Sequence, residues 1–246
     1  MNNLSIVGSL LAVAALSCEA AGNSTATARG AAGSNGSSSV VIVDGKTVYG
    51  SSESVIGQGP VKEEARPVAW FNAVMIDGPV DVTYTISTKP SVRLLAQENI
   101  LPLITVEVVA GQLVLATNRS FSTSAPIRAL VAGPSPVAVR INGSGSFVGA
   151  GLAGTALQLR IAGSGNIKAS GSVDTVNVVV EGSGDVDIVG IKAKSADIQV
   201  HGSGDVYTYA SQSARVDVSG SGDVRIKGAP PKRNVERAGS GDVIFE

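Results

Sequence analysis

A column of acidic residues is the part of this sequence best placed to do chemistry. The chain repeats six times a phrase in which Gly-Ser-Gly is followed by a polar residue and then by an apolar one. The polar residues are Ser146, Asn166, Asp185, Asp205, Asp223 and Asp242. If the repeats stack, the aspartates line up, one in each repeat. Carboxylates ~5 Å apart repel by roughly 0.8 kcal/mol in bulk water, so something must offset the repulsion.

Two interpretations of this column stay open. One is a calcium site, because calcium takes oxygen ligands and occurs in Gly- and Asp-rich β-rolls. The other is turn chemistry, in which each aspartate accepts hydrogen bonds from backbone N–H groups. We favour the second, since β-rolls use a nonapeptide repeat and one aspartate per repeat supplies few ligands. We predict no cofactor, and the alternative is calcium held by Asp185, Asp205, Asp223 and Asp242.

Other residues could support catalysis only with help that the sequence does not supply. His201 is the one histidine, and Glu181 and Ser219 stand at the equivalent places one repeat away, but no oxyanion hole is evident. The nearest acidic cluster consists of Asp185, Asp187 and Asp205. Such clusters serve polysaccharide lyases and hydrolases that are built on parallel β-helices. No P-loop or Gly-x-Ser-x-Gly pattern is present. We therefore predict no catalytic residues.

The repeats themselves predict β-strands. The phrases start 20, 19, 20, 18 and 19 residues apart, and a fixed period of this size is typical of a stacked solenoid. Apolar and polar residues alternate on both sides of Gly-Ser-Gly, which indicates strands with one buried face. Glycine adopts φ > 0 without a Cβ clash, so the pair of glycines lets the chain bend sharply. We predict an all-β fold, a parallel β-helix with coils of about 19 residues. A stack of antiparallel hairpins is the alternative.

The composition agrees with a β-solenoid and excludes several classes of protein. Of the 246 residues, 43% are hydrophobic, which is enough for a sizeable core, while only 4% are aromatic. A net charge of −1 without a Lys/Arg cluster gives no electrostatic basis for binding nucleic acid. Cys18 is the sole cysteine, which excludes an intramolecular disulfide and a cysteine zinc site.

The N-terminal sequence predicts export and a tether. Residues 4–17 form an apolar run that is too short to span a bilayer, and we assign residues 1–18 as a signal peptide. Ala15-Leu16-Ser17-Cys18 is compatible with a lipobox, which predicts lipidation of Cys18; the alternative is ordinary cleavage after Ala20. Residues 19–65 are rich in small polar residues and predict a flexible tether with a hairpin at 40–50. Residues 66–246 form the solenoid domain.

The outward positions of the repeats carry further signals. Tyr207 and Tyr209 are the aromatic residues near the outer faces of the repeats, and a shallow groove with tyrosines would favour a glycan ligand. The outward column three places before each phrase changes from basic to acidic: Arg140, Arg160, Val179, Gln199, Asp217 and Glu236. This column is interpreted as a solvated face, or as a bias toward end-to-end association. Pro230-Pro231 and Arg237 interrupt the last coil and predict a terminal cap.

The motifs together resemble a known family. They are Phe71-x-x-Val-x-Ile-x-Gly-x-Val-x-Val, then Glu98-Asn99-Ile100-Leu101, then Val106-x-Val-x-x-Gly-x-Leu-x-Leu, and then the repeated Gly-Ser-Gly-Asp-Val. Over residues 66–246 this pattern is similar to the head GIN domain, which occurs in bacterial proteins named as auto-transporter adhesins. The resemblance implies a β-helix-like fold, secretion and attachment to the cell envelope, and it supplies no catalytic residues. Ser146 and Asn166 depart from the aspartate of the later repeats.

These observations lead to one expected function and two alternatives. We expect an exported protein of the cell envelope, in the periplasm or at the outer membrane, held to the membrane by a lipid on Cys18. Its role would be that of a non-catalytic adhesin or surface-binding protein whose ligand is a glycan or another envelope protein. The alternatives are a polysaccharide-active enzyme on the same scaffold and a purely structural envelope protein.

Overall fold

The computed structural model describes residues 39–43, 46–50 and 54–246, and nearly all of its elements are β-strands. The chain divides into two units, residues 1–51 and 52–246. In the first unit, β1 (Ser39–Val43) and β2 (Lys46–Gly50) pair antiparallel. The predicted signal peptide with Cys18, and most of the predicted tether, lie outside the described residues. In the described part of the chain, no helix is long and apolar enough to cross a membrane.

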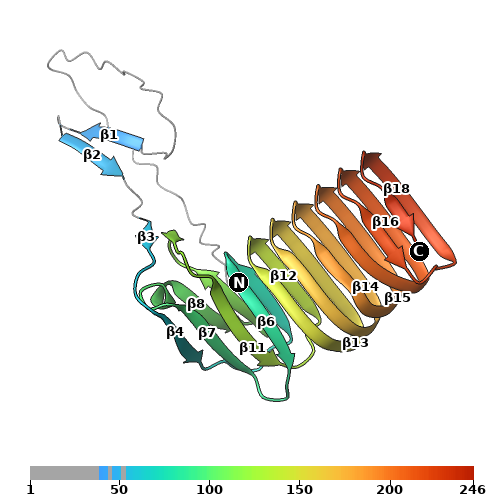
Figure 1. Cartoon of the computed structure of the whole chain (residues 1–246), viewed down its shortest axis with the longest axis horizontal. Helices are drawn as coiled ribbons and strands as arrows, with labels where there is room; N and C mark the ends of the chain where they lie inside the picture. The colour runs from blue at the N-terminus through green and yellow to red at the C-terminus, as the bar shows by residue number, and fades with distance from the viewer. Residues whose placement is uncertain (1–38, 44–45, 51–53) are drawn as a thin grey trace, which may run out of the picture. The chain divides into compact units, whose positions relative to one another are not determined.

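The second unit contains the predicted solenoid. Four strands, β13 (Ser146–Gly163), β14 (Asn166–Gly182), β15 (Val186–Gly202) and β16 (Val206–Gly220), stack as successive coils (Figure 1). Each pairs in parallel with the next. The stack continues through β17 (Val224–Lys227) and β18 (Lys232–Gly239) on β16, and β19 (Val243–Phe245) on β17. Every ladder between repeats is parallel, so the solenoid prediction is confirmed and the alternative of stacked hairpins is wrong for the repeats.

The core of the coils consists of stacked apolar columns. Because equivalent residues are in register, each coil covers the apolar face of the one before it. One fully buried column contains Ile141, Ile161, Val180, Val200 and Val218. Another contains Phe147, Ile167, Val186, Val206 and Val224. Coil length varies between these columns, where the register shifts, for example between Gly149 and Leu152. Differences in repeat length are therefore accommodated by register shifts that lie away from the Gly-Ser-Gly corner.

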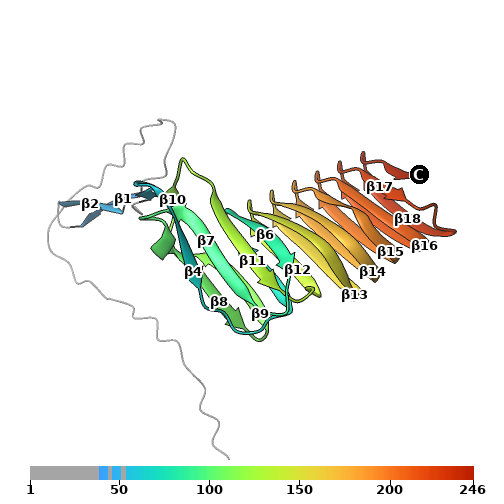
Figure 2. The same ribbon diagram turned by 60° about the horizontal axis from the view of Figure 1, so that its bottom comes forward.

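The N-terminal half forms two layers that lead into the coils (Figure 2). One layer runs from β8 (Ile104–Val109) through β9 (Gln112–Thr117), β5 (Ala73–Asp77) and β12 (Ala138–Gly143) to the second half of β13. The other runs from β4 (Val61–Arg66) through β7 (Ser91–Gln97), β11 (Ile127–Gly133) and β6 (Val80–Ile86) to the first half of β13. The short 3-10 helix η1 (Leu101–Leu103) precedes β8. Each layer therefore continues one side of the coils toward the N-terminal end of the stack.

Antiparallel pairing in this half is a difference from the uniform parallel helix that the sequence predicts. β8 pairs antiparallel with β9, and β7 pairs antiparallel with both β11 and β4. The β8–β9 reversal occurs at Ala110 and Gly111, whose φ values are 50° and 78°. Two consecutive positive φ angles form the tight turn of a hairpin. The region has no period of its own because its strands do not repeat one coil.

The folded unit also begins earlier than predicted. β3 (Val55–Ile56) pairs with β10 (Phe121–Ser122), and β4 pairs with β7, so the tether prediction is wrong for residues 54–65. The sequence of β4 does not predict a strand, because five of its six residues are exposed and apolar and polar residues do not alternate. It is held by ladder hydrogen bonds and by ion pairs, Lys62–Glu98 at 2.6 Å and Arg93–Glu63 at 2.9 Å.

The two glycines of each phrase have different tasks, which corrects the expectation that both bend the chain. The first, such as Gly202 with φ 142°, has the positive φ that turns the chain. The second, such as Gly204, is buried, and a Cβ there would overlap the carbonyl oxygen of Gly184 one coil away. The second glycine is thus required by the close approach of neighbouring corners.

Two outer faces meet at this corner and are named here. Face A holds the outward residues three, five and seven places after the first glycine of each phrase, such as Asp205, Tyr207 and Tyr209. Face B holds the outward residues one, three and five places before it, such as Arg160 and Gln158. Both faces are flat ladders in which equivalent residues of successive coils are neighbours.

Candidate ligand-binding site

The aspartate column lies along the edge of face A and makes hydrogen bonds between coils. One carboxylate oxygen of Asp185, Asp205 and Asp223 accepts the backbone N–H of the equivalent residue in the next coil. The N···O distances are 2.9 Å from Asp205 to Asp185, 2.8 Å from Asp223 to Asp205 and 2.9 Å from Asp242 to Asp223. Asn166 accepts in the same way from Asp185 at 3.0 Å. We call this set of bonds the corner ladder.

The corner ladder is a variant of the predicted turn chemistry. The bonds run between coils, whereas an Asx turn would bond within one turn. The column extends into the N-terminal layers, since Ser146 donates its hydroxyl to Asp81 Oδ1 at 2.7 Å. Asn166 therefore takes part with an amide oxygen, whereas the N–H of Asn166 itself donates to the carbonyl oxygen of Gly145 at 3.2 Å and not to Ser146. Among the described residues, no group of three or more His, Cys, Asp and Glu side chains is arranged to hold a metal ion.

The histidine and its neighbours lie on face B, in the positions that the sequence predicts. Glu181 is directly opposite His201 in the ladder, and His201 is directly opposite Ser219. Glu181 is engaged by Arg160, at 2.5 Å. His201 and Ser219 are both exposed. No hydrogen bond links the three side chains in the part of the chain that the structure describes, so the ladder brings them together without forming a charge-relay arrangement.

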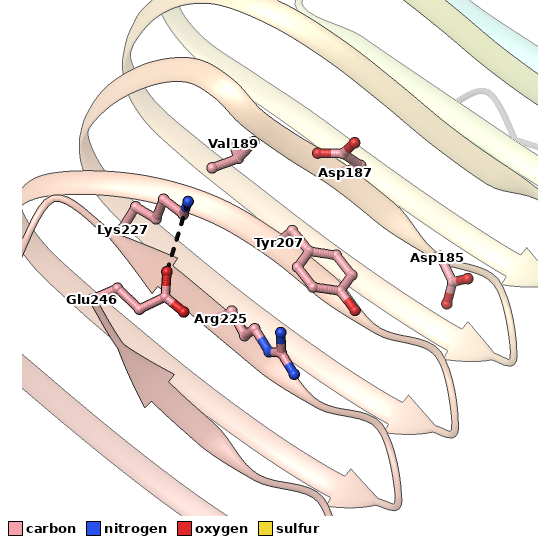
Figure 3. Close-up of a pocket in the computed structure, with 7 residues that line it drawn as sticks. All are labelled: Asp185, Asp187, Val189, Tyr207, Arg225, Lys227 and Glu246. Atoms are coloured by element: carbon pink, nitrogen blue, oxygen red, sulfur yellow. Dashed lines mark ion pairs between the residues drawn. The ribbon is translucent and has the colours of Figure 1, made fainter.

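A groove on face A brings together the most varied set of side chains. It has a volume of about 480 Å³ and is lined by Asp185, Asp187, Val189, Tyr207, Arg225, Lys227 and Glu246. Figure 3 shows Tyr207 between Asp187, on the preceding coil, and Arg225, on the following one. The register agrees, because Tyr207 is directly opposite both residues. Stacking of coils alone therefore assembles the groove.

Charges of both signs surround the tyrosine. The Arg225 guanidinium lies 5.7 Å from the centre of the Tyr207 ring, and the Tyr207 hydroxyl donates to Asp205 Oδ2 at 3.5 Å. At the edges of the groove, Lys227 is 3.7 Å from Glu246, and Asp187 is 3.1 Å from Lys168. These ion pairs are on the surface, so each contributes little to stability and can exchange partners with a ligand.

The second tyrosine of the same strand lies outside the groove. Tyr209 is covered by Lys192, whose ammonium nitrogen is 4.1 Å from the ring centre. Arg225, Lys227 and Glu246 are groove residues that the sequence analysis missed. The signal was available, since they stand five or seven places after the first glycine, as Tyr207 and Tyr209 do. An alignment of the repeats by column would have found them.

The groove suits a polar ligand with an apolar surface. A partly exposed tyrosine ring can pack against the C–H face of a ring-shaped ligand, while its hydroxyl makes hydrogen bonds. The carboxylates of Asp185 and Asp187 accept hydrogen bonds, and Arg225 and Lys227 donate them. A sugar fits this description, because it combines hydroxyl groups that donate and accept hydrogen bonds with an apolar C–H face. The arrangement is less suited to hydrolysis, because Asp185 already accepts a backbone hydrogen bond in the corner ladder and Asp187 is paired with Lys168.

The sequence matches a known protein family, and the fold matches solved structures. A family model described as "Putative auto-transporter adhesin, head GIN domain" matches residues 70–230. No match was found among curated proteins. The family match spans the N-terminal layers except β4, and most of the coils.

Three solved structures with a similar fold come from species of Bacteroides and Parabacteroides. A "putative adhesin" from Bacteroides fragilis has a TM-score of 0.64 at 20% identity, covering 78% of this chain and 100% of that one. A "putative lipid binding protein" from Parabacteroides distasonis has a TM-score of 0.55 at 20% identity, covering 79% and 100%. A "putative adhesin" from Parabacteroides merdae has a TM-score of 0.50 at 16% identity, covering 78% and 98%. At these identities the likeness concerns the fold.

Proposed function

The chain belongs to the head GIN domain family, and we propose that it is a non-catalytic surface-binding module of the bacterial cell envelope that holds a glycan in the face A groove. The observation that supports this most directly is Tyr207, an aromatic ring set between Asp187 and Arg225 on a rigid ladder. A ring with donors and acceptors on either side is what recognition of a sugar requires. The name of the family, and the description of two structural neighbours as adhesins, agree with a binding role.

Rigidity is the second argument for binding. Asp187, Tyr207, Arg225 and Lys227 are carried by strands paired with their neighbours, and their backbone positions are set by the register of the coils. A preformed site loses little conformational entropy when a ligand binds. The two alternative functions, a polysaccharide-active enzyme and a purely structural envelope protein, are not favoured by any observation on the described residues.

The proposal includes export and anchoring. A lipid on Cys18 would hold the chain to a membrane, and the small polar residues from 19 onward would separate the anchor from the solenoid. Expression of the full chain in a bacterium with metabolic labelling by a fatty-acid analogue tests this. We expect label and membrane retention for the wild type and loss of both in Cys18→Ser. Equal labelling of the two chains would contradict the anchor.

A glycan array followed by titration calorimetry tests the binding site. We expect the purified chain to bind a limited set of neutral glycans, and Tyr207→Ala to weaken binding by about tenfold or more, the loss expected for a stacked aromatic ring. Tyr209→Ala is the matched control, because Tyr209 is on the same strand but outside the groove. The glycan affinity of this variant should stay within about twofold of that of the wild type. The proposal fails if no glycan binds, or if both variants bind like the wild type.

A further inference from the structure

A second cavity lies on face B, close to the N-terminal layers. It has a volume of about 390 Å³ and is lined by Met75, Arg140, Asn142, Gln158, Leu159, Arg160, Asn177 and Val179. Arg140 of β12 and Arg160 of β13 are directly opposite each other in the parallel ladder, so their backbones are ~4.8 Å apart. Both residues are exposed. Like charges directly opposite each other in a ladder are unfavourable, and this pair therefore requires a source of negative charge.

Residues 54–246 supply only part of that negative charge. Arg160 is paired with Glu181 at 2.5 Å. Within residues 54–246, Arg140 makes no ion pair, and no carboxylate lines the cavity. The acidic residues nearest in register are Asp77, opposite Asn142, and Asp197, opposite Asn177. Arg140 thus lines the cavity without an ion pair among residues 54–246, beside Arg160, which is paired with Glu181, and three neutral amides.

The side chains around Arg140 indicate the chemical class of the ligand. A guanidinium presents a planar pair of N–H donors that matches a carboxylate in a two-point contact. Asn142, Gln158 and Asn177 each offer donors and an acceptor, as the hydroxyl groups of a sugar require. A bare anion would use the donors and leave the amide oxygens without a partner. Met75 is directly opposite Arg140 and Val179 is directly opposite Arg160 in the ladder, and both can pack against the C–H face of a sugar ring.

We propose that face B carries an acidic-glycan site, in which Arg140 binds the carboxylate of a uronic acid residue and the three amides bind its hydroxyl groups. Arg160, whose positive charge is neutralised by Glu181, forms a second edge of the site. The ladder is open along the stack, so an extended polysaccharide chain can continue across neighbouring coils. This site is separate from the face A groove and does not depend on a ligand there.

Titration calorimetry of the purified chain with oligogalacturonate tests the proposal. We expect measurable binding that weakens at least about tenfold in Arg140→Gln, which removes the charge but keeps a polar side chain. Arg140→Lys keeps the charge without the fork and should be intermediate. Arg215→Gln is the matched control, because Arg215 is an exposed face B arginine outside this cavity, and it should bind like the wild type. The melting temperature of each variant verifies that it is folded.

Two ligand controls separate the chemistry. The methyl-esterified oligomer has the same hydroxyl groups without the charge, and it should bind at least about tenfold more weakly. Inorganic phosphate should compete with oligogalacturonate only weakly, because it lacks the hydroxyl groups of the sugar ring. Absence of binding by the wild type, equal binding by the ester, equal binding by Arg140→Gln, or displacement by phosphate at equal concentration would each overturn the proposal. Tyr207→Ala should leave oligogalacturonate binding unchanged, so failure of this site and failure of the face A groove are distinguishable.

Discussion

At the scale of the residue, the corner ladder explains why aspartate recurs where charge repulsion would disfavour it. Each carboxylate accepts a backbone N–H of the next coil, and a hydrogen bond to a charged acceptor contributes about 1.5–3 kcal/mol. That exceeds the roughly 1 kcal/mol of repulsion between exposed neighbours at this spacing. The sequence identified the column and its neutral first members. It did not reveal the direction of the bonds, since an Asx turn and an inter-coil bond use the same residue.

The corner ladder predicts different effects for two substitutions of Asp205. Asp205→Ala leaves the N–H of Asp223 without its acceptor and should lower the free energy of unfolding by about 1–3 kcal/mol. Asp205→Asn keeps an acceptor oxygen and removes a charge, so the loss should be below about 1 kcal/mol. Urea unfolding measures both. Asp174→Ala, which breaks only the surface pair with Lys194, is the control and should cost at most about 1 kcal/mol.

Calcium provides the opposing outcome for the same variants. With turn chemistry, wild-type unfolding is the same with calcium and with chelator. A calcium-dependent rise in stability that disappears in Asp205→Asn would instead make the column an ion site, because a ligand at about 100 times its Kd adds roughly 2.7 kcal/mol.

At the scale of the element, the second glycine of each phrase allows neighbouring coils to stack closely, because it has no Cβ. A Cβ at Gly204 would overlap the carbonyl oxygen of Gly184 and lie 2.9 Å from Val180 Cγ1. Gly204→Ala should therefore cost at least about 2 kcal/mol, as overpacking does. Gly154→Ala is the control, since its nearest atom would be 3.9 Å away, and its effect should be within about 0.5 kcal/mol. Similar losses for both variants in thermal unfolding would mean that glycine flexibility, and not close approach, is what matters.

Elements were predictable from sequence wherever burial alternates. The strands of the coils follow from columns such as Ile141 to Val218, because period-two burial and a fixed repeat length predict stacked strands. The parallel direction that excludes stacked hairpins comes from the structure. β4 was missed because an exposed, charged edge strand has no alternation, and its pairing depends on ladder bonds to β7. The antiparallel layers were missed for a related reason. A turn such as Ala110-Gly111 sets strand direction locally, and nothing repeats to reveal it.

The candidate site was only half predictable. Tyr207 could be selected as an outward aromatic residue, and Asp187 as part of an acidic cluster. Their meeting with Arg225 depends on the register between β15, β16 and β17, which is a property of neighbouring coils. The face B cavity is similar: Arg140 and Arg160 were visible as a column, but only the structure shows that Glu181 pairs with Arg160 and that Arg140 makes no ion pair within residues 54–246.

At the scale of the whole molecule, the N-terminal layers and the coils share one core. Tyr84 of β6 lies where they join, with its ring centre 6.4 Å from that of Phe71 and 5.6 Å from that of Phe147, the first aromatic residue of the coils. Its hydroxyl donates to the carbonyl oxygen of Pro134 at 2.5 Å. Burial raises the pKa of the Tyr84 phenol well above its usual value. The titration of one side chain is thereby linked to the stability of the entire unit.

This linkage predicts loss of stability in alkali. Below pH about 10, the phenol is protonated in both the folded and the unfolded chain, so it adds no pH dependence. Above that pH the unfolded chain releases the proton while the folded chain keeps it, and the free energy of unfolding falls by up to about 1.4 kcal/mol per pH unit. Tyr84→Phe loses the hydrogen bond to Pro134, about 1 kcal/mol at pH 7, but has no phenol to titrate. The stability gap between wild type and Tyr84→Phe should therefore narrow from pH 9 to pH 11 in urea unfolding, whereas a constant gap would show that the folded state ionises Tyr84 as readily as the unfolded chain does.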